Sequence, residues 1–239
     1  PLIGWSMSKS ITHALIGRAI QEELLDPDKP PKVPEWSDPQ DPRHRISLDQ
    51  LLRMNSGLAF EESTGTLNSD LVRMLTQEAD MAGFAASQPL SKKPGKKWSY
   101  SSGTTNILSR ILRHAIDDDQ RYWSFPKQAL FEPLGMTTAV LESDNIGTLV
   151  GSSLVWASGR DWAGFGQLYP SIRAAGTASN FCPQPGFGRH GRLRGDPSRP
   201  MPRTGGSAAA NQGPICPMTA FQLRAIRDNF FWWLHPSAR

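Results

Sequence analysis

Cysteine, histidine and tyrosine are scarce in this chain. Its 239 residues include 2 Cys, 5 His and 3 Tyr, and no cluster of residues has the spacing of metal ligands. No segment repeats, and no apolar run is long enough for a transmembrane helix. The sequence therefore predicts no metal site and no cofactor, and no membrane-spanning segment is seen in it. The cell compartment stays open between periplasm and cytoplasm, because both cysteines lie in a segment of unusual composition.

That segment, residues 170–239, has few acidic residues and no lysine. It contains nine Arg, two Asp and no Glu, a net charge of +7, whereas residues 1–169 hold 17 basic and 20 acidic residues, a net charge of −3. A basic tail can bind nucleic acid or an anionic surface. The arginines are scattered, however, and the tail includes an aromatic run over residues 230–233. We therefore expect no nucleic-acid partner.

What the chain does have is a serine and a lysine at helical spacing near its start. Ser6 and Lys9 are three residues apart, so on a helix their side chains face the same side and can touch. Apolar residues recur at helical spacing after Ser6, which predicts a helix over residues 6–25. A hydroxyl beside an amine can form a nucleophile with its own proton acceptor. The alternative is an N-cap serine followed by a solvated lysine.

Tyr100 lies in a loop rich in hydroxyl groups. The segment Tyr100-Ser101-Ser102 follows a Pro94-Gly95 turn and precedes an apolar helical pattern over residues 105–116. Loops held between rigid elements often carry catalytic groups. The alternative is an ordinary packed tyrosine whose hydroxyl bonds the backbone.

Together these motifs resemble the serine β-lactamase and penicillin-binding-protein superfamily, and most closely its 6-aminohexanoate-dimer hydrolase and esterase-like branch. The resemblance covers residues 1–169. Four stretches also resemble sequences of this family: residues 1–10, 51–58, 132–136 and 158–166. It implies an α+β fold of the β-lactamase type, a helical subdomain plus an antiparallel sheet flanked by helices. We expect that fold to be incomplete and mostly helical here, because strands at both ends of the family fold are missing or altered.

The resemblance implies a serine hydrolase that cleaves an amide, lactam or ester bond of a small molecule. Ser6 would attack the carbonyl carbon and form an acyl-enzyme, which water then releases. Lys9 would take the proton of Ser6, although lysine serves as a base only where burial or a neighbouring cation lowers its pKa. Tyr100 would pass a proton to the leaving group, and Ser102 is a candidate substrate-binding residue. Backbone N–H groups of Ser6 and of a strand in the C-terminal third would hold the oxyanion.

Residues 170–239 depart from the resemblance, and we interpret them as translated in a shifted reading frame. From the third base of the Ala174 codon through Pro183, the genetic code permits Cys-Trp-Asn-Gly-Glu-Gln-Phe-Leu-Pro. With the same offset from Arg224 it permits Gly-His-Pro-Gly-Gln-Leu-Leu-Leu-Val-Ala. A Trp-Asn-Gly-Glu turn and a Gly-His-x-Gly-Gln motif both resemble family text. We therefore divide the chain into a serine hydrolase domain, residues 1–169, truncated at its N-terminus, and a frame-shifted, poorly ordered tail, residues 170–239.

Cap and hydrophobic patterns predict further helices. We expect short helices over residues 47–54 and 125–130, a helical pattern over 69–84 and a helix over 158–169. A second Ser-x-x-Lys, from Ser124 to Lys127, contains Pro126 and is interpreted as the entry from a loop into a helix. The proline-rich residues 26–45 form either an ordered surface wrap or a loose loop.

Two histidines are further candidates. His13 follows Lys9 by four residues, and we interpret it as packed rather than catalytic. His114 and the acidic residues after it would complete a Ser-His-Asp triad with Ser6. Ser6 lacks the Gly-x-Ser-x-Gly elbow of such enzymes, because Ser8 takes the place of the last glycine.

Two functions of different classes are therefore open. The chain is either an active Ser-Lys-Tyr hydrolase or a non-catalytic truncated or frame-shifted product, at most a binding module with a basic tail. Covalent labelling of Ser6 by a serine-reactive probe separates them.

Overall fold

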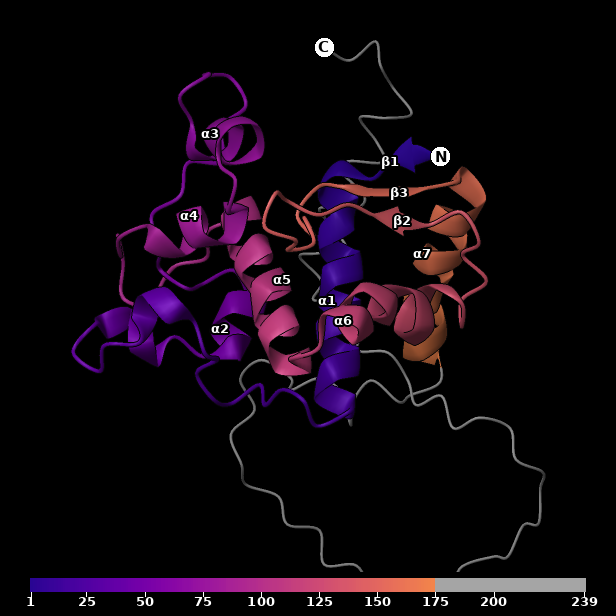
Figure 1. Ribbon diagram of the computed structural model, residues 1–239, viewed down its shortest axis with the longest axis horizontal. Helices are drawn as coiled ribbons and strands as arrows, with labels where there is room; N and C mark the ends of the chain where they lie inside the picture. The colour runs from indigo at the N-terminus through magenta and orange to yellow at the C-terminus, as the bar shows by residue number, and fades with distance from the viewer. Residues whose placement is uncertain (175–239) are drawn as a thin grey trace, which may run out of the picture.

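The computed structural model describes residues 1–174, with side chains through residue 168. Helices make up most of this part (Figure 1): α1 (Ser8–Gln21), α2 (Leu48–Leu52), α3 (Asp70–Gln77), α4 (Met81–Ser87), α5 (Ser102–Ile116), α6 (Asp119–Pro126) and α7 (Gly159–Ala174). Short 3₁₀ segments, η1 (Trp5–Met7), η2 (Pro34–Trp36) and η3 (Pro42–Arg45), and a π segment, η4 (Lys127–Phe131), join them. The mostly helical α+β fold expected from the sequence is confirmed.

The predicted frame-shifted tail lies outside the described residues. Helix α7 begins after Ser158, as its cap spacing predicts, and runs five residues past the expected end at residue 169. Among the described helices, none is long and apolar enough to cross a membrane.

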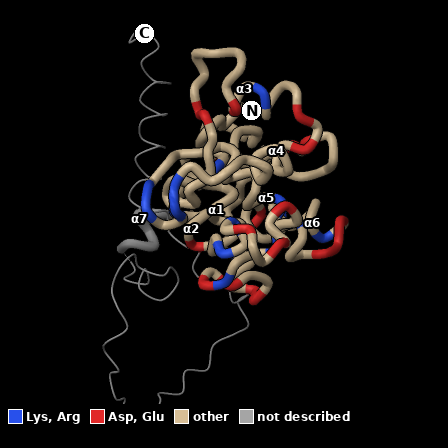
Figure 2. Tube along the Cα trace, turned by 90° about the vertical axis from the view of Figure 1, so that its left-hand side faces the viewer, with Lys and Arg blue, Asp and Glu red and all other residues tan. Residues whose placement is uncertain are grey.

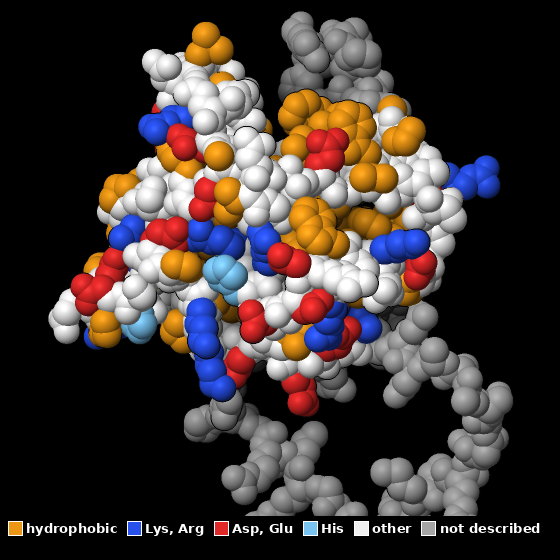
Figure 3. All heavy atoms as spheres, in the orientation of Figure 1, with side chains coloured by type: hydrophobic (Ala, Val, Ile, Leu, Met, Phe, Trp, Pro, Cys, Tyr) orange, Lys and Arg blue, Asp and Glu red, His pale blue; other side chains and the backbone are white. Residues whose placement is uncertain are grey.

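Three short antiparallel strands form a sheet beside α1. Strands β1 (Leu2–Ile3) and β2 (Val140–Leu141) flank the central β3 (Val155–Ala157). Val155 and Ala157 are fully buried and face the core, whereas Trp156, between them, points the other way. Trp156 is opposite Val140, which is largely exposed. The outer face of the sheet is therefore apolar, and Figure 3 shows hydrophobic side chains gathering over this region at the upper right.

Helix α1 lies at the centre of the molecule and is buried on most sides. Its apolar residues, with Ile11 and Ile16 fully buried, join the hydrophobic core. Its buried polar residues need partners, because an unbonded polar group in the interior is costly. Ser8 Oγ accepts a hydrogen bond from Val155 N at 3.2 Å, and Thr12 Oγ1 donates one to the Gly151 oxygen at 3.0 Å. The polar side of α1 thus faces the loop that precedes β3.

Most predicted helices are present, with altered limits. The predicted helix over residues 6–25 is η1 followed by α1, which ends at Gln21. The helix predicted over residues 47–54 is α2, which a capping box of Ser47 and Gln50 opens. The pattern over residues 69–84 splits into α3 and α4, because Asp80 caps a new helix by accepting from Gly83 N at 2.7 Å.

The expectation that Ser124 marks a loop-to-helix entry is wrong. Helix α6 already begins at Asp119, where the Asp118 side chain caps it by accepting from Arg121 N, and Ser124 lies inside it. Pro126 is tolerated within this helix. A proline there removes one N–H donor, and the π segment η4 follows it directly.

The proline-rich residues 26–45 are an ordered wrap rather than a loose loop. Trp36, in η2, is 3% exposed, and its Nε1 donates to the Ala86 oxygen at 2.8 Å. Val33 is also buried in the core. This segment therefore packs against α4.

Candidate active site

Ser6 lies in a tight turn between β1 and α1. A Cβ atom added to Gly4 would come 2.4 Å from the Trp162 ring, so only glycine fits there. Trp5 has φ +43°, a left-handed conformation that is rare for a bulky residue. Strain of this kind is often found at functional turns. The N-cap residue of α1 is Met7, so the alternative that Ser6 caps the helix is wrong.

Lys9 is buried, at 6% exposure, and its amine is surrounded by oxygen atoms. Lys9 Nζ donates to Ser6 Oγ at 3.2 Å, to Ser102 Oγ at 2.9 Å and to the main-chain oxygen of Ser152 at 3.1 Å. The alternative of a solvated lysine is therefore wrong. In Figure 1 the loop before β3, which carries Ser152, reaches the space between the upper ends of α1 and α5.

Tyr100 lies directly before α5 and beside Lys9. Its ring centroid is 4.8 Å from Lys9 Nζ, a cation–π distance. The ring of Trp98 lies next to it, with 6.4 Å between the two centroids. The structure thus brings both Ser6 and Tyr100 to the Lys9 amine, across more than ninety residues in the case of Tyr100, and the contact of Tyr100 is through its ring.

Ser102, the candidate substrate-binding residue, is the first residue of α5 and is 2% exposed. Its hydroxyl accepts from Lys9 and donates to the Glu62 carboxylate in a very short hydrogen bond. The other Glu62 oxygen accepts from Ser102 N at 2.7 Å. Both partners of the Ser102 hydroxyl, Lys9 and Glu62, are groups of the protein itself. Contact between Ser102 and a substrate therefore stays a prediction.

Glu62 and Ser152 were missed by the sequence analysis. Glu62 belongs to a polar loop without periodicity, and Ser152 contributes a main-chain oxygen, which any residue type can supply. Asn106 of α5 fixes the Ser152 loop by accepting from Ser152 N at 3.1 Å. Burial raises the pKa of the Glu62 carboxyl, against the opposing effects of the Lys9 charge and of the hydrogen bonds from Ser102.

The two histidine candidates lie apart from this chemistry. His114 is twelve residues beyond Ser102 on α5, which at the helical rise places it about 18 Å along the axis. A triad with Ser6 is therefore excluded. His13 is 6% exposed, and burial lowers its pKa to about 4, so its imidazole is neutral near pH 7. Its Nδ1 is buried without a hydrogen-bond partner.

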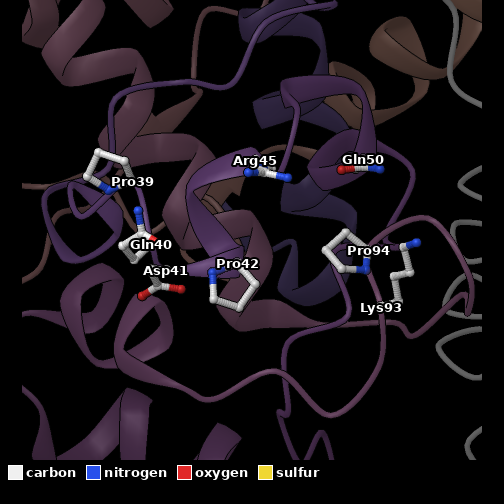
Figure 4. A pocket seen from close by; sticks show the side chains of 8 residues that line it. All are labelled: Pro39, Gln40, Asp41, Pro42, Arg45, Gln50, Lys93 and Pro94. Atoms are coloured by element: carbon white, nitrogen blue, oxygen red, sulfur yellow. The ribbon is translucent and has the colours of Figure 1, made fainter.

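Two surface features lie outside the site. A cavity of about 420 Å³ (Figure 4) is lined by residues of the proline-rich wrap and its neighbours: Pro39, Gln40, Asp41, Pro42, Arg45, Gln50, Lys93 and Pro94. None of the catalytic candidates lines it. Figure 2 shows Lys and Arg positions interspersed with Asp and Glu positions along the described chain. Within that part, no group of three or more acidic, His or Cys side chains could hold a metal ion.

The sequence profile of the Beta-lactamase family matches residues 4–210. The chain belongs to the Beta-lactamase family. The match includes Ser6, Lys9 and Tyr100 and continues past residue 169, where the sequence analysis divides the chain. None of the curated proteins matches it.

Solved structures of Beta-lactamase-like proteins share the fold. A putative 6-aminohexanoate-dimer hydrolase from Bacillus anthracis has a TM-score of 0.55 and 20% identity, over 74% of this chain and 48% of its own. A penicillin binding protein from Bacillus halodurans has a TM-score of 0.55 and 15% identity, over 71% and 60%. A beta-lactamase/D-alanine carboxypeptidase from Yersinia pestis has a TM-score of 0.52 and 19% identity, over 69% and 52%.

The predicted resemblance to this superfamily is therefore confirmed. This chain spans about half the length of the solved structures it matches. At these identities the likeness shows the fold alone.

Proposed function

We propose that this chain is a serine hydrolase in which Ser6 is the nucleophile, Lys9 the proton acceptor and Tyr100 the proton donor to the leaving group. The substrate class is a small-molecule amide, lactam or ester. The observation that carries the proposal is the 3.2 Å separation of Lys9 Nζ and Ser6 Oγ on one face of a strained strand-to-helix turn.

The contacts of Lys9 support its role as a base. A neutral amine has two N–H groups and one lone pair. The Ser102 oxygen and the Ser152 carbonyl can accept the two N–H groups, which directs the third position of Nζ toward Ser6. In the neutral amine the lone pair would then face Ser6, and the 3.2 Å contact that the ammonium donates to Ser6 Oγ would reverse, with the Ser6 hydroxyl as donor.

The proposed reaction uses these three side chains in turn. Ser6 Oγ attacks the carbonyl carbon while its proton moves to Lys9 Nζ, and the tetrahedral oxyanion forms. Collapse of that intermediate breaks the carbonyl bond to nitrogen or oxygen, and the leaving group takes a proton from the Tyr100 hydroxyl, which regains one from Lys9. Water then attacks the acyl-enzyme by the same route in reverse. The N–H of Ser6 is one oxyanion donor, and the second is expected from a strand outside the described residues.

A second candidate function is a non-catalytic product that keeps the nucleophile segment without turnover. The solved structures that share the fold are longer, and this chain covers 44% to 48% of several of them. Such a chain would hold the three side chains but lack part of the surrounding scaffold.

A labelling experiment decides between the two. The purified protein is incubated with a fluorophosphonate probe and, separately, with penicillin, and the adduct is located by peptide mass spectrometry. The hydrolase predicts a covalent adduct on Ser6 that Ser6→Ala abolishes. Ser10→Ala is the matched control, since it removes a buried hydroxyl without a partner on the same helix and should leave labelling intact. A protein with no adduct from either probe would be the non-catalytic product.

A further inference from the structure

We propose that Glu62 is a positioning residue of this site: it fixes the direction of the hydrogen bonds from Ser102 to Lys9, so that the basic position of Lys9 points at Ser6. This inference rests on the proposed function and adds a residue to it. Glu62 lies forty residues before Ser102 and contacts neither Ser6 nor Lys9 by a hydrogen bond.

Both oxygens of the Glu62 carboxylate accept hydrogen bonds from Ser102. One oxygen binds the backbone N–H of Ser102, and the other binds its hydroxyl hydrogen. The backbone N–H belongs to the first turn of α5, where it has no partner within the helix. Both donors come from a single residue, so the carboxylate holds Ser102 at two points.

This arrangement decides which way the Ser102 hydroxyl points. Because its hydrogen is directed to Glu62, the lone pairs of its oxygen face Lys9 and accept an N–H of Nζ at 2.9 Å. If the hydroxyl turned around, it would donate to the lone pair of a neutral Lys9. Ser102 would then compete with Ser6 for the base. Glu62 prevents this competition without touching the reacting atoms.

A carboxylate is needed for this role, and an amide fails at it. Glutamine has one acceptor oxygen where glutamate has two. The backbone N–H of Ser102 cannot change direction, so it would take that oxygen. The amide NH₂ of the glutamine would face the Ser102 hydroxyl and turn its hydrogen toward Lys9. Glu62→Gln is thus nearly isosteric, but it makes the Ser102 hydroxyl an acceptor from residue 62 and a donor toward Lys9, the reverse of the parent arrangement.

The test compares the kinetics of fluorophosphonate labelling at Ser6 in four proteins: the parent chain, Glu62→Gln, Ser102→Ala and the double variant. For Glu62→Gln we expect the limiting labelling rate to fall roughly 10²-fold, the scale of a misplaced catalytic group. The probe concentration at half-maximal rate should change little, because Glu62 does not contact the probe. Glu61→Gln, the same chemical change at the exposed neighbouring residue, is the matched control and should label at the parent rate.

The double variant separates positioning from a structural role. If Glu62 acts through the Ser102 oxygen, Glu62→Gln should have no further effect once Ser102→Ala is present. Additive losses would overturn the proposal, as would a Glu62→Gln protein that labels at the parent rate. Thermal unfolding checks that each variant is folded at the assay temperature. If Glu62→Gln does not fold, Ser102→Ala takes its place, because it interrupts the same chain of hydrogen bonds from Glu62 to Lys9. Labelling of Ser102→Ala at the parent rate would then overturn the proposal.

The failure of the proposed function has a different signature. A parent protein that gains no adduct on Ser6 overturns the hydrolase and the role of Glu62 together. A parent protein that is labelled, with an unaffected Glu62→Gln variant, overturns the role of Glu62 alone.

Discussion

Lys9 Nζ lies 3.1 Å from the main-chain oxygen of Ser152, which ties the start of α1 to the loop before β3. Two further contacts hold that loop: Thr12 Oγ1 donates to the Gly151 oxygen, and Asn106 accepts from Ser152 N. The position of the Lys9 amine therefore depends on close packing between α1, α5 and a short loop.

That dependence predicts the effect of Gly151→Ala. A Cβ at this position would come 2.0 Å from Thr12 Oγ1 and 2.5 Å from Ser109 Oγ. The loop would have to shift, at a cost of about 1–3 kcal/mol in stability. A shift of about 1 Å in the Ser152 oxygen should slow Ser6 labelling on the order of 10²-fold. The measurements are the labelling rate and the thermal unfolding curve.

Gly164→Ala is the control for this substitution. Gly164 lies in α7 with open space around the added Cβ, so the variant should label normally and unfold at the same or a higher temperature. Normal labelling of Gly151→Ala would show that the Ser152 oxygen does not position Lys9.

A second prediction concerns the hydroxyl of Tyr100. Tyr100→Phe keeps the ring beside Lys9 and removes the proton donor alone, so the fold and probe affinity should be retained. Loss of one general acid–base group typically costs about 10²–10⁴-fold, and we expect a decrease of that order in turnover of an activated ester. The measurement is kcat and KM in parallel with thermal unfolding.

The same substitution at the buried Tyr122 should have the opposite pattern. Its hydroxyl accepts from Leu149 N at 2.9 Å, and removing it leaves a buried donor unpaired at about 1–3 kcal/mol. Tyr122→Phe should therefore unfold at a lower temperature while its turnover per folded molecule stays the same. Equal turnover in Tyr100→Phe and the parent protein would remove Tyr100 from the mechanism.

The local parts of the site could be predicted from the sequence. The contact between Ser6 and Lys9 follows from i, i+3 geometry, and the capping box at Ser47 follows from side chains within one turn. The place of Tyr100 beside Lys9 was predicted from the resemblance of its motif to the family. Each of these predictions depends only on residues close together in the sequence or on one short motif.

The missing parts depend on tertiary structure. Glu62 reaches Ser102 across forty residues, and the Ser152 oxygen reaches Lys9 across more than a hundred, with no pattern in either loop. Strands of two or three residues, such as β2, are too short for an alternation of side chains to be recognised. The strained Trp5 also has no sequence signature, because its neighbours impose its conformation.

A third prediction concerns His13 and acid stability. Burial lowers its folded pKa to about 4, below the usual 6.5, so the unfolded chain binds the extra proton between these values. Stability should be unaffected by His13 above pH 6.5 and should fall as the pH drops from 6.5 through about 4. The expected loss is about 3 kcal/mol, from the linkage between proton binding and unfolding.

Thermal unfolding across this pH range, with His13→Leu as the variant, checks the prediction. The variant should lose this part of the pH dependence. His114→Gln, which changes an exposed histidine of α5, is the control and should keep it. An unchanged pH dependence in His13→Leu would mean that other groups cause the acid sensitivity.

The last prediction concerns the reading frame after Tyr169. The described residues end with α7, so most of this segment lies outside them. If residues 170–239 are frame-shifted, the nucleotide sequence read from the third base of the Ala174 codon should encode a Trp-Asn-Gly-Glu segment. The same frame should encode Gly-His-x-Gly-Gln followed by an apolar strand near codon 224. Restoring that frame would supply the second oxyanion donor, and one such donor is worth about 10²–10³-fold in rate. The frame-restored chain should therefore acylate Ser6 faster than the present chain by about that factor. Sequencing the DNA around codons 168–175 is the direct measurement, and a shifted frame that encodes neither motif would show that the present tail is the true sequence.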